Sequence, residues 1–303
     1  MGTHRHFLDV DDLDPDELAA LLERAATRRD HPDRVEPTPL TRRTLAMLFE
    51  KPSTRTRVSF ETGMTRLGGH AIFLGPDDTQ LDRGEPLKDT ARALSGYVDA
   101  IMARVFAHEH LEELAAYATV PVINALSDAA HPCQTLADLL TIDDVVGLEA
   151  DPQVAWVGDG NNVARSFAVG CAMLGLDLTI ATPADYGVGE DVLDRAAGFD
   201  RRPATTDDPV AAVADADVVY TDVWVSMGQE DDRAAKLAAF DGFQLNEELI
   251  AHAAEDVAVM HCLPAHRGEE VTDGVLESEH AVVWRQAENR MHAQNALLTE
   301  LID

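Results

Sequence analysis

The sequence predicts an α/β protein of two doubly wound domains, each a parallel sheet with helices on both faces. Short apolar runs of strand length alternate with amphipathic helical segments along the chain, which favours parallel strands joined by helices. A length of 303 residues suits two domains of about 150 residues each. Polar turns follow several predicted strands, and open α/β sheets bind ligands at such positions.

The first domain is expected to cover residues 1–147. Residues 14–29 predict an opening helix, because leucines at helical spacing follow an acidic first turn that contains a proline. Further helices are expected from residue 53 or 54 to the glycines at 68 and 69, near 87–94, near 111–115 and from about 132 to 145. The expected strands are 44–49, 71–74, 98–104 and 120–123.

The second domain is expected to cover residues 148–303 and to repeat the same alternation. A helix is predicted at 163–174, and further helices should separate the strands. The expected strands are 154–157, 178–181, 218–221 and 257–260. We expect the last helix, about 286–303, to pack back on the first domain.

The charge of the chain excludes some partners. Fifty-five acidic residues against 24 basic ones give a formal net charge of −31, which would repel nucleic acid. The acidic residues are spread along the chain, and Lys51, Lys88 and Lys236 are its only lysines. Such an acidic surface resembles that of halophilic proteins, which work in molar salt where self-repulsion is screened.

Hydropathy and cysteine content predict a cytoplasmic location. No apolar run is long enough to span a bilayer, and the N-terminal residues lack the apolar core of a signal peptide. Three cysteines, at positions 133, 171 and 262, argue against a disulfide framework and fit a reducing compartment.

The turn at residues 50–57 predicts an anion site. A strand leads there into a helix whose N-cap is Ser53 or Thr54. Unpaired backbone N–H groups and the positive end of the helix dipole attract a phosphate at such a position. The side chains of Arg55 and Arg57 would add guanidinium groups that match phosphate oxygens.

The run Ser-Thr-Arg-Thr-Arg at residues 53–57 resembles the carbamoyl-phosphate signature of the transcarbamylases. That family transfers a carbamoyl group from carbamoyl phosphate to an amine. The resemblance implies that Ser53, Thr54, Arg55 and Thr56 hold the phosphate. It also implies that Arg104, His131 and Thr56 polarise the carbonyl oxygen.

The turn at 158–163 could be taken for a dinucleotide-binding loop. However, Gly-Asp-Gly-Asn-Asn-Val lacks the third glycine of that motif. An oxidoreductase with a nucleotide cofactor is therefore disfavoured, and no cofactor is expected. Two amides at a strand end can instead bind an amino acid, and Asn162 is similar to the family's amino-acid-binding asparagine.

Two later motifs resemble the ornithine-type branch of the family. Asp222, Ser226 and Met227 match its Asp-x-x-x-Ser-Met-Gly motif, and His-Cys-Leu-Pro at 261–264 matches its second signature. The resemblance implies that Asn162, Asp222, Ser226 and Met227 hold the amino-acid end of ornithine. It also implies that Cys262 lies near the entering amine. Roles in orienting the carbamoyl group are implied for Gln134, Leu263 and Arg290.

The resemblance therefore implies attack of the ornithine δ-amine on carbamoyl phosphate, giving citrulline and phosphate. It also implies a trimer or an assembly of trimers, in which Gln80 reaches a neighbour's site. Transfer to putrescine or to an acylated ornithine is the alternative, and a catalytically silent binding subunit is a further one. No metal is expected, because His-x-His at 4–6 and 108–110 lacks a third convergent ligand.

Overall fold

The computed structural model describes residues 5–81, 84–226 and 230–302. The chain forms two compact units, one of residues 1–137 and 289–303 and the other of residues 138–288. The sequence-based boundary at 147 and 148 stays a prediction. No described helix is both long and apolar enough to cross a membrane.

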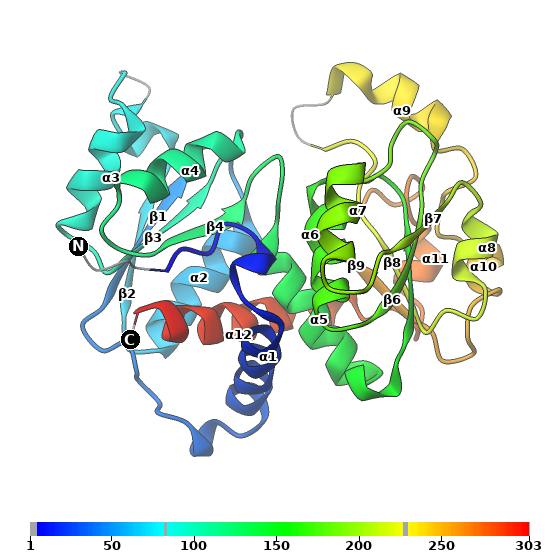
Figure 1. The fold of residues 1–303 in the computed structure, drawn as a ribbon, viewed down its shortest axis with the longest axis horizontal. Helices are drawn as coiled ribbons and strands as arrows, with labels where there is room; N and C mark the ends of the chain where they lie inside the picture. Colours follow the sequence, from blue (N-terminus) through cyan, green and yellow to red (C-terminus); the bar gives the residue numbers. More distant parts are fainter. Residues whose placement is uncertain (1–4, 82–83, 227–229, 303) are drawn as a thin grey trace. The chain divides into compact units, whose positions relative to one another are not determined.

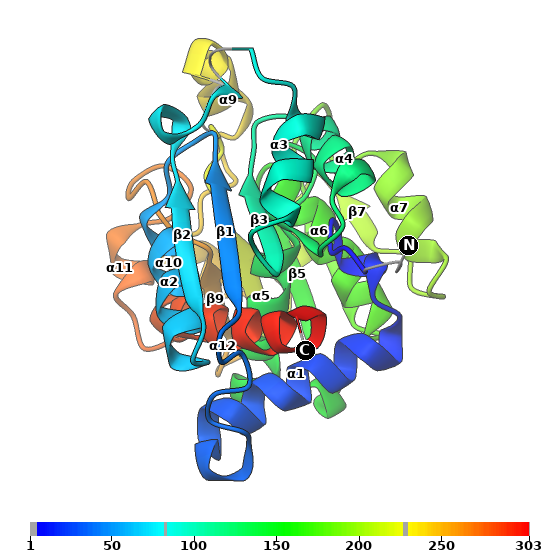
Figure 2. The same ribbon diagram turned by 90° about the vertical axis from the view of Figure 1, so that its left-hand side faces the viewer.

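The first unit contains a parallel four-stranded sheet in the order β2-β1-β3-β4, and Figure 2 shows β2, β1 and β3 side by side. Its strands are β1 (Thr44–Phe49), β2 (His70–Leu74), β3 (Ala100–Arg104) and β4 (Val122–Leu126). β4 begins after Pro121 and not before it, because a proline has no N–H group for the ladder.

Helices cover both faces of this sheet (Figure 1). Alternate strand residues such as Leu48 and Ile101 pack with Ala91, Leu111 and Leu114 of α3 and α4, while α2 and α12 lie on the other face. The helices in this unit are α1 (Pro15–Asp30), α2 (Thr54–Arg66), α3 (Leu87–Ser95), α4 (His108–Tyr117), the start of α5 (Pro132–Val145) and most of α12 (Val283–Ile302).

The second unit contains a parallel five-stranded sheet in the order β7-β6-β5-β8-β9. Its strands are β5 (Gln153–Val157), β6 (Asp177–Ala181), β7 (Ala204–Thr206), β8 (Val218–Thr221) and β9 (Ala258–His261). The sequence analysis missed β7. This edge strand has only three residues, Ala-Thr-Thr, none of them fully buried, so it shows no apolar run.

Side chains from the two faces of this sheet enter separate cores. Trp156 and Tyr220 pack against Phe167 of α6, with ring centroids 6.3 and 5.1 Å from the Phe167 ring. On the other face, Val157 and Val219 join the cluster formed by α8, α10 and α11. The helices are α6 (Asn162–Met173), α7 (Glu190–Ala197), α8 (Pro209–Val213), α9 (Arg233–Ala239), α10 (Glu247–Ile250) and α11 (Asp273–Leu276). The predicted α/β class, with two doubly wound parallel sheets, is confirmed.

Candidate active site

Each sheet has one topological switch point, and several of the predicted motifs lie there. In the first unit β1 lies between β2 and β3, so the chain leaves β1 on one side and returns on the other. In the second unit β5 lies between β6 and β8 in the same way. Open α/β sheets bind ligands at the carboxyl ends of such strand pairs. The turns after β1, β3, β5 and β8 are therefore the candidate sites.

The turn after β1 presents a hydroxyl pair at the start of α2. Ser53 is the N-cap, and its Oγ accepts a hydrogen bond from the Thr56 N–H at 3.4 Å. The Thr56 Oγ1 accepts from the Ser53 hydroxyl at 2.9 Å and from Arg290 Nη2 at 2.6 Å. A hydroxyl has one proton of its own, so Thr56 keeps a donor for a further acceptor. Arg55 and Thr54 follow in the first helical turn, where the dipole is positive.

Buried polar side chains from three other segments belong to the same unit. Arg104 ends β3, and its carbonyl oxygen accepts from the Glu50 N–H at 2.9 Å. His131 and Gln134 lie at the start of α5, and Gln134 Oε1 accepts from Arg290 Nη1 at 3.3 Å. Arg104, His131, Gln134 and Arg290 are each at most 5% exposed.

The electrostatics of this group favour a neutral histidine. Burial lowers the pKa of His131 well below its ordinary value, and the positive charges of Arg290, Arg104 and Lys51 lower it further. A neutral imidazole surrounded by cations can donate a hydrogen bond to an oxygen on which negative charge develops. The arrangement therefore suits an anionic ligand with a polarised carbonyl group.

Lys51 is a member of this group that the sequence analysis did not assign to the site. Its ammonium nitrogen lies 5.1 Å from the centroid of the Phe106 ring. Burial, together with the positive charge of Arg104, lowers the pKa of Lys51 to about 8. The sequence could have indicated this role, because Lys51 is one of three lysines in the chain and lies two residues before Ser53.

Arg57 is a correction to the sequence analysis. Its guanidinium group lies 3.8 Å from the centroid of the Phe73 ring and donates from Nε to Glu61 Oε1 at 3.0 Å. With a carboxylate and an aromatic ring as its neighbours, Arg57 serves the outer face of α2 and not the phosphate turn. Gln80, expected to act across a subunit boundary, is exposed.

The second unit places a buried carboxylate at its switch point. Asp222 directly follows β8 and is 6% exposed. Its Oδ2 accepts from Asn161 Nδ2 at 2.8 Å, and its Oδ1 accepts from the Cys262 thiol at 3.0 Å. Asn161 also caps α6, because its Oδ1 accepts from the N–H groups of Val163 and Ala164. The sequence analysis assigned Asn162 and missed Asn161, whose amide holds Asp222.

A buried ion pair joins the turn after β5 to α9. Lys236 Nζ of α9 donates to Asp159 Oδ2 at 2.6 Å, and both side chains are only 9% exposed. Lys236 Nζ also lies 5.6 Å from the centroid of the Tyr186 ring. Burial raises the pKa of Asp159, the hydrogen bond and charge of Lys236 oppose that rise, and the charge of Asp222 adds to it. The two carboxylates are therefore close enough to repel one another.

A buried histidine shapes the turn that carries Cys262 and Leu263. The Leu263 N–H donates to His261 Nδ1 at 2.8 Å, so Nε2 carries the ring proton and donates to Glu270 Oε1 at 3.0 Å. Leu263 adopts a φ of 59°, a region that side chains other than glycine rarely occupy. His261 and Glu270 thus hold Leu263 in an unusual conformation next to the thiol.

Asp222, His261 and Cys262 have ligand atoms within 4.8 Å of one another, as a metal site would. However, both ring nitrogens of His261 are engaged by hydrogen bonds. Without His261, two ligands remain in this cluster, fewer than a structural metal site uses. In this cluster Asp222 is a carboxylate that accepts hydrogen bonds, which does not suit a metal site. The absence of a metal stays a prediction.

The remaining predicted residues differ in how deeply they are buried. Asn162 begins α6 and is half-buried, as is Ser226 in the segment after β8. Met227 lies outside the described residues. Cys133 and Cys171 are fully buried, and burial raises the pKa of the Cys133 thiol to about 12. Those two thiols are inert members of the core.

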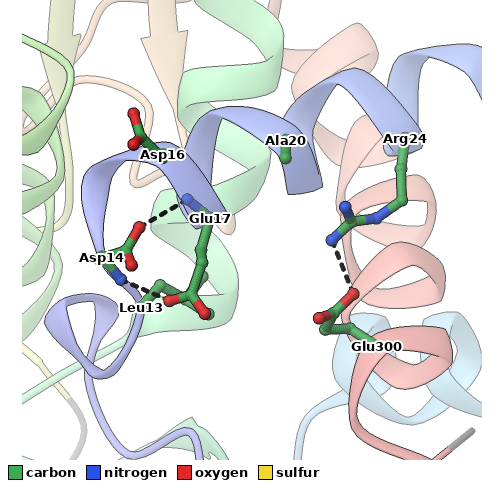
Figure 3. A pocket seen from close by; sticks show the side chains of 7 residues that line it. All are labelled: Leu13, Asp14, Asp16, Glu17, Ala20, Arg24 and Glu300. Carbon is green, nitrogen blue, oxygen red and sulfur yellow. Dashed lines mark hydrogen bonds and ion pairs between the residues drawn. The ribbon is translucent and has the colours of Figure 1, made fainter.

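A surface pocket of about 240 Å³ lies beside the start of α1 and not at a strand end (Figure 3). Three of its four acidic residues are engaged locally. Asp14 and Glu17 form the helix cap through two 2.8 Å bonds, and Arg24 pairs with Glu300 at 2.8 Å. The pocket therefore belongs to the framework of the first unit.

Comparisons with known proteins match the two halves of the chain to two different binding domains. A family model described as the carbamoyl-P binding domain of aspartate/ornithine carbamoyltransferases matches residues 5–144. The Asp/Orn binding domain of the same enzymes matches residues 150–301.

Individual relatives cover essentially the whole chain. The ornithine carbamoyltransferase of Haloquadratum walsbyi is 61% identical over 100% of this chain and 99% of its own length. That of Archaeoglobus fulgidus is 51% identical over 98% of this chain and 97% of its own. The solved ornithine carbamoyltransferase from Pyrococcus furiosus superposes with a TM-score of 0.94 at 51% identity, covering 99% of this chain and 97% of that one. A mutant N-acetyl-L-ornithine transcarbamylase has a TM-score of 0.87 at 31% identity, covering 98% and 99%.

Proposed function

Because the chain belongs to the aspartate/ornithine carbamoyltransferase family, we propose that it carbamoylates the δ-amine of L-ornithine with carbamoyl phosphate, giving L-citrulline and phosphate. The observation that carries this choice of substrate is Asp222, a buried carboxylate at the switch point of the second unit. It would attract an ammonium group and repel the side chain of aspartate. The reaction belongs to arginine metabolism.

The first unit binds carbamoyl phosphate in this proposal. Ser53, Thr54, Arg55 and Thr56 hold the phosphate at the start of α2, where the backbone N–H groups and the helix dipole also contribute. Arg104, neutral His131 and the Thr56 hydroxyl donate to the carbonyl oxygen. One such donor is typically worth about 3 to 4 kcal/mol of the barrier.

Gln134 and Arg290 support the carbamoyl group. Their side chains are hydrogen bonded to each other at 3.3 Å, and Arg290 also binds Thr56. This link fixes the carbamoyl-binding groups relative to the phosphate-binding hydroxyls. Leu263, which the family resemblance also assigns to the carbamoyl group, belongs to the second unit, and its role stays a prediction.

The second unit binds the amino-acid end of ornithine. Asp222 accepts the α-ammonium group, while Asn162, Ser226 and Met227 complete the contacts to the backbone of the amino acid. Cys262, whose thiol donates to Asp222 at 3.0 Å, keeps that carboxylate oriented. The three cysteines are thiols, which fits a reducing compartment, and we place the reaction in the cytoplasm.

The chemical step forms one bond and breaks one. The neutral δ-amine nitrogen attacks the carbonyl carbon, and the tetrahedral intermediate expels phosphate with the electron pair of the broken C–O bond. The amine loses one proton in the process, and the leaving phosphate accepts it. No side chain is required as a general base.

A comparison of four amines tests the function. Carbamoyl phosphate is incubated with ornithine, putrescine, N-acetylornithine or aspartate, and the ureido product of each is measured. Ornithine should give the highest kcat/KM by at least about tenfold, because putrescine lacks the α-ammonium and carboxylate groups and acetylation removes the α-ammonium charge. A preference for putrescine or acetylornithine would contradict the assignment of ornithine.

The family resemblance also supports a homotrimer, or an assembly of trimers, in which the exposed Gln80 acts in a neighbouring subunit. Gln80→Ala and Arg55→Ala chains, which should each show little activity at a carbamoyl phosphate concentration near the wild-type KM, are refolded together and the mixed trimers are isolated. Partial recovery of activity is expected, since some sites then contain both intact residues. Isolated mixed trimers without activity would contradict a shared site.

The acidic surface supports function in molar salt. A net charge of −31 per chain repels itself at low ionic strength, and salt shortens the Debye length from roughly 10 Å at 0.1 M to 3 Å at 1 M. Melting temperature and citrulline formation should therefore both rise with KCl over this range. A flat or falling melting temperature would exclude halophilic adaptation.

A further inference from the structure

The Lys236–Asp159 ion pair has no role in the reaction just described, yet Asp159 lies in the turn after β5 that also carries Asn161 and Asn162 of the amino-acid site. Asp159 and Asn161 belong to one turn after β5, and Asn161 donates to Asp222 at 2.8 Å. Lys236 is buried, although it lies on a helix whose neighbouring residues are largely exposed. Burying an ammonium group is costly unless it is paired, so its placement calls for a reason.

The turn is built to bring Lys236 to Asp159. Gly160 N–H donates to the Tyr186 carbonyl at 2.8 Å, and a Cβ on Gly160 would lie 2.4 Å from the Gly187 carbonyl carbon. Only glycine permits this approach, which places the Tyr186 ring against Lys236 Nζ. The ring and the Asp159 carboxylate are thus both fixed around one ammonium group.

The two carboxylates of this region, Asp159 and Asp222, have different kinds of partner. Asp159 is neutralised by Lys236, whereas Asp222 is held by the Asn161 amide and the Cys262 thiol. Within the described residues, no ion pair joins Asp222 to a cationic side chain. Among the described residues, one of the two carboxylates is therefore paired with a cation of the protein, and the other accepts hydrogen bonds from an amide and a thiol.

We propose that the Lys236–Asp159 pair sets the charge of the amino-acid site. Asp159 holds Lys236 away from Asp222. The negative charge of Asp222 is therefore not neutralised by Lys236, and it can bind the α-ammonium group of the substrate. Both members of the pair are positioning residues, and the inference rests on the proposed function of Asp222. The pair therefore contributes to selection of a substrate with an α-ammonium group over one without it.

Removal of the carboxylate tests this directly. In Asp159→Asn, Lys236 loses the charge of the Asp159 carboxylate, and its own charge then opposes an ammonium group at Asp222. We expect the Kd of L-norvaline, which has the α-ammonium group but no δ-amine, to rise about tenfold by calorimetry. The Kd of pentanoate, the same molecule without its amino group, should not rise. The KM of ornithine should rise with that of norvaline, while kcat and the KM of carbamoyl phosphate change little.

The charge-balanced double variant distinguishes electrostatics from packing. Asp159→Asn combined with Lys236→Met removes both charges, so norvaline should bind within about threefold of the wild type. Lys236→Arg, which keeps the charge, should also bind norvaline normally. If Asp159→Asn does not fold, Asp159→Ser takes its place, since its hydroxyl can still accept from Lys236 without a charge.

Three results would overturn the proposal. They are an unchanged norvaline affinity in the single variant, an equal loss for norvaline and pentanoate, and a double variant that binds no better than the single one. Failure of the proposed function would look different, because the wild-type protein itself would then form no citrulline and bind no norvaline.

Discussion

The two units share one architecture but carry opposite charge at their switch points. In the first unit Arg104, Arg290 and Lys51 surround a neutral histidine. In the second unit Asp222 and Asp159 lie close enough to repel one another. The difference teaches that the fold supplies the place for a ligand, while the side chains at the strand ends decide its charge. In the proposed function, one set of turns binds a phosphate and the other binds an ammonium group.

Arg55→Ala should give the largest effect and should affect only one of the two substrates. Loss of a charge-assisted contact to phosphate is expected to raise the KM of carbamoyl phosphate about 100-fold, with the KM of ornithine within about threefold. Arg57→Ala is the matched control, because Arg57 contacts Glu61 and Phe73 instead. Steady-state kinetics with each substrate varied would detect the contrast, and equal losses in both variants would refute it.

Asp222→Ala should show the opposite selectivity. The KM of ornithine is expected to rise about 30-fold, because a buried carboxylate that binds ammonium is lost. The phosphonate analogue of carbamoyl phosphate should bind as in the wild type. Inhibition by this analogue provides the check, and a parallel loss of its affinity would make Asp222 a structural residue.

Stability should depend on pH through His131, a residue of the first unit. Its pKa is lowered in the folded state, so below about pH 6.5 the unfolded chain binds a proton that the folded chain does not. The contribution of His131 is present above that pH, and about 1.4 kcal/mol should be lost for each unit of acidification until the folded pKa is reached.

Urea denaturation between pH 5 and pH 7 would measure this slope as a difference between variants, on the order of that value. His131→Gln should show a smaller slope than the wild type. His252→Gln, which changes an exposed histidine, should keep the wild-type slope. Identical slopes in all three proteins would mean that His131 titrates normally in the folded state.

Cys262 gives the smallest expected effect and sharpens the description of the second site. Cys262→Ala removes the donor to Asp222 and should raise the KM of ornithine about threefold, the lower end for a lost hydrogen bond. Cys262→Ser retains a donor and should stay closer to the wild type. If serine and alanine behaved alike in this assay, the thiol would act through its size and not through its hydrogen bond.

Much of the framework could be predicted from the sequence because its signals are local. The apolar run at 44–49 and the hydroxyl of Ser53 fix the first strand and the start of α2 without reference to the rest of the chain. The three-residue edge strand β7 was missed, since it buries no apolar side chain that would reveal it. Pattern-based prediction succeeds where neighbouring residues carry the information.

Partners of long side chains could not be predicted, because they depend on distant residues. Arg57 has the same motif context as Arg55, yet a phenylalanine from β2 and a glutamate one turn later hold it. Lys236 and Asp159 are 77 positions apart, and nothing in either local sequence indicates their pairing. Likewise, nothing in the local sequence indicates that Asn161, and not Asn162, donates to Asp222.

The division of the first unit into two chain segments has a consequence for biosynthesis. Residues 289–303 belong to the same unit as residues 1–137, and Arg290 supplies the donor that holds Thr56 in the phosphate turn. Domains generally begin to fold from the N-terminus while the chain is still being synthesised. The first unit, although it is translated first, must wait for its last helix. Its phosphate-binding turn can therefore be completed only after the whole second unit has left the ribosome.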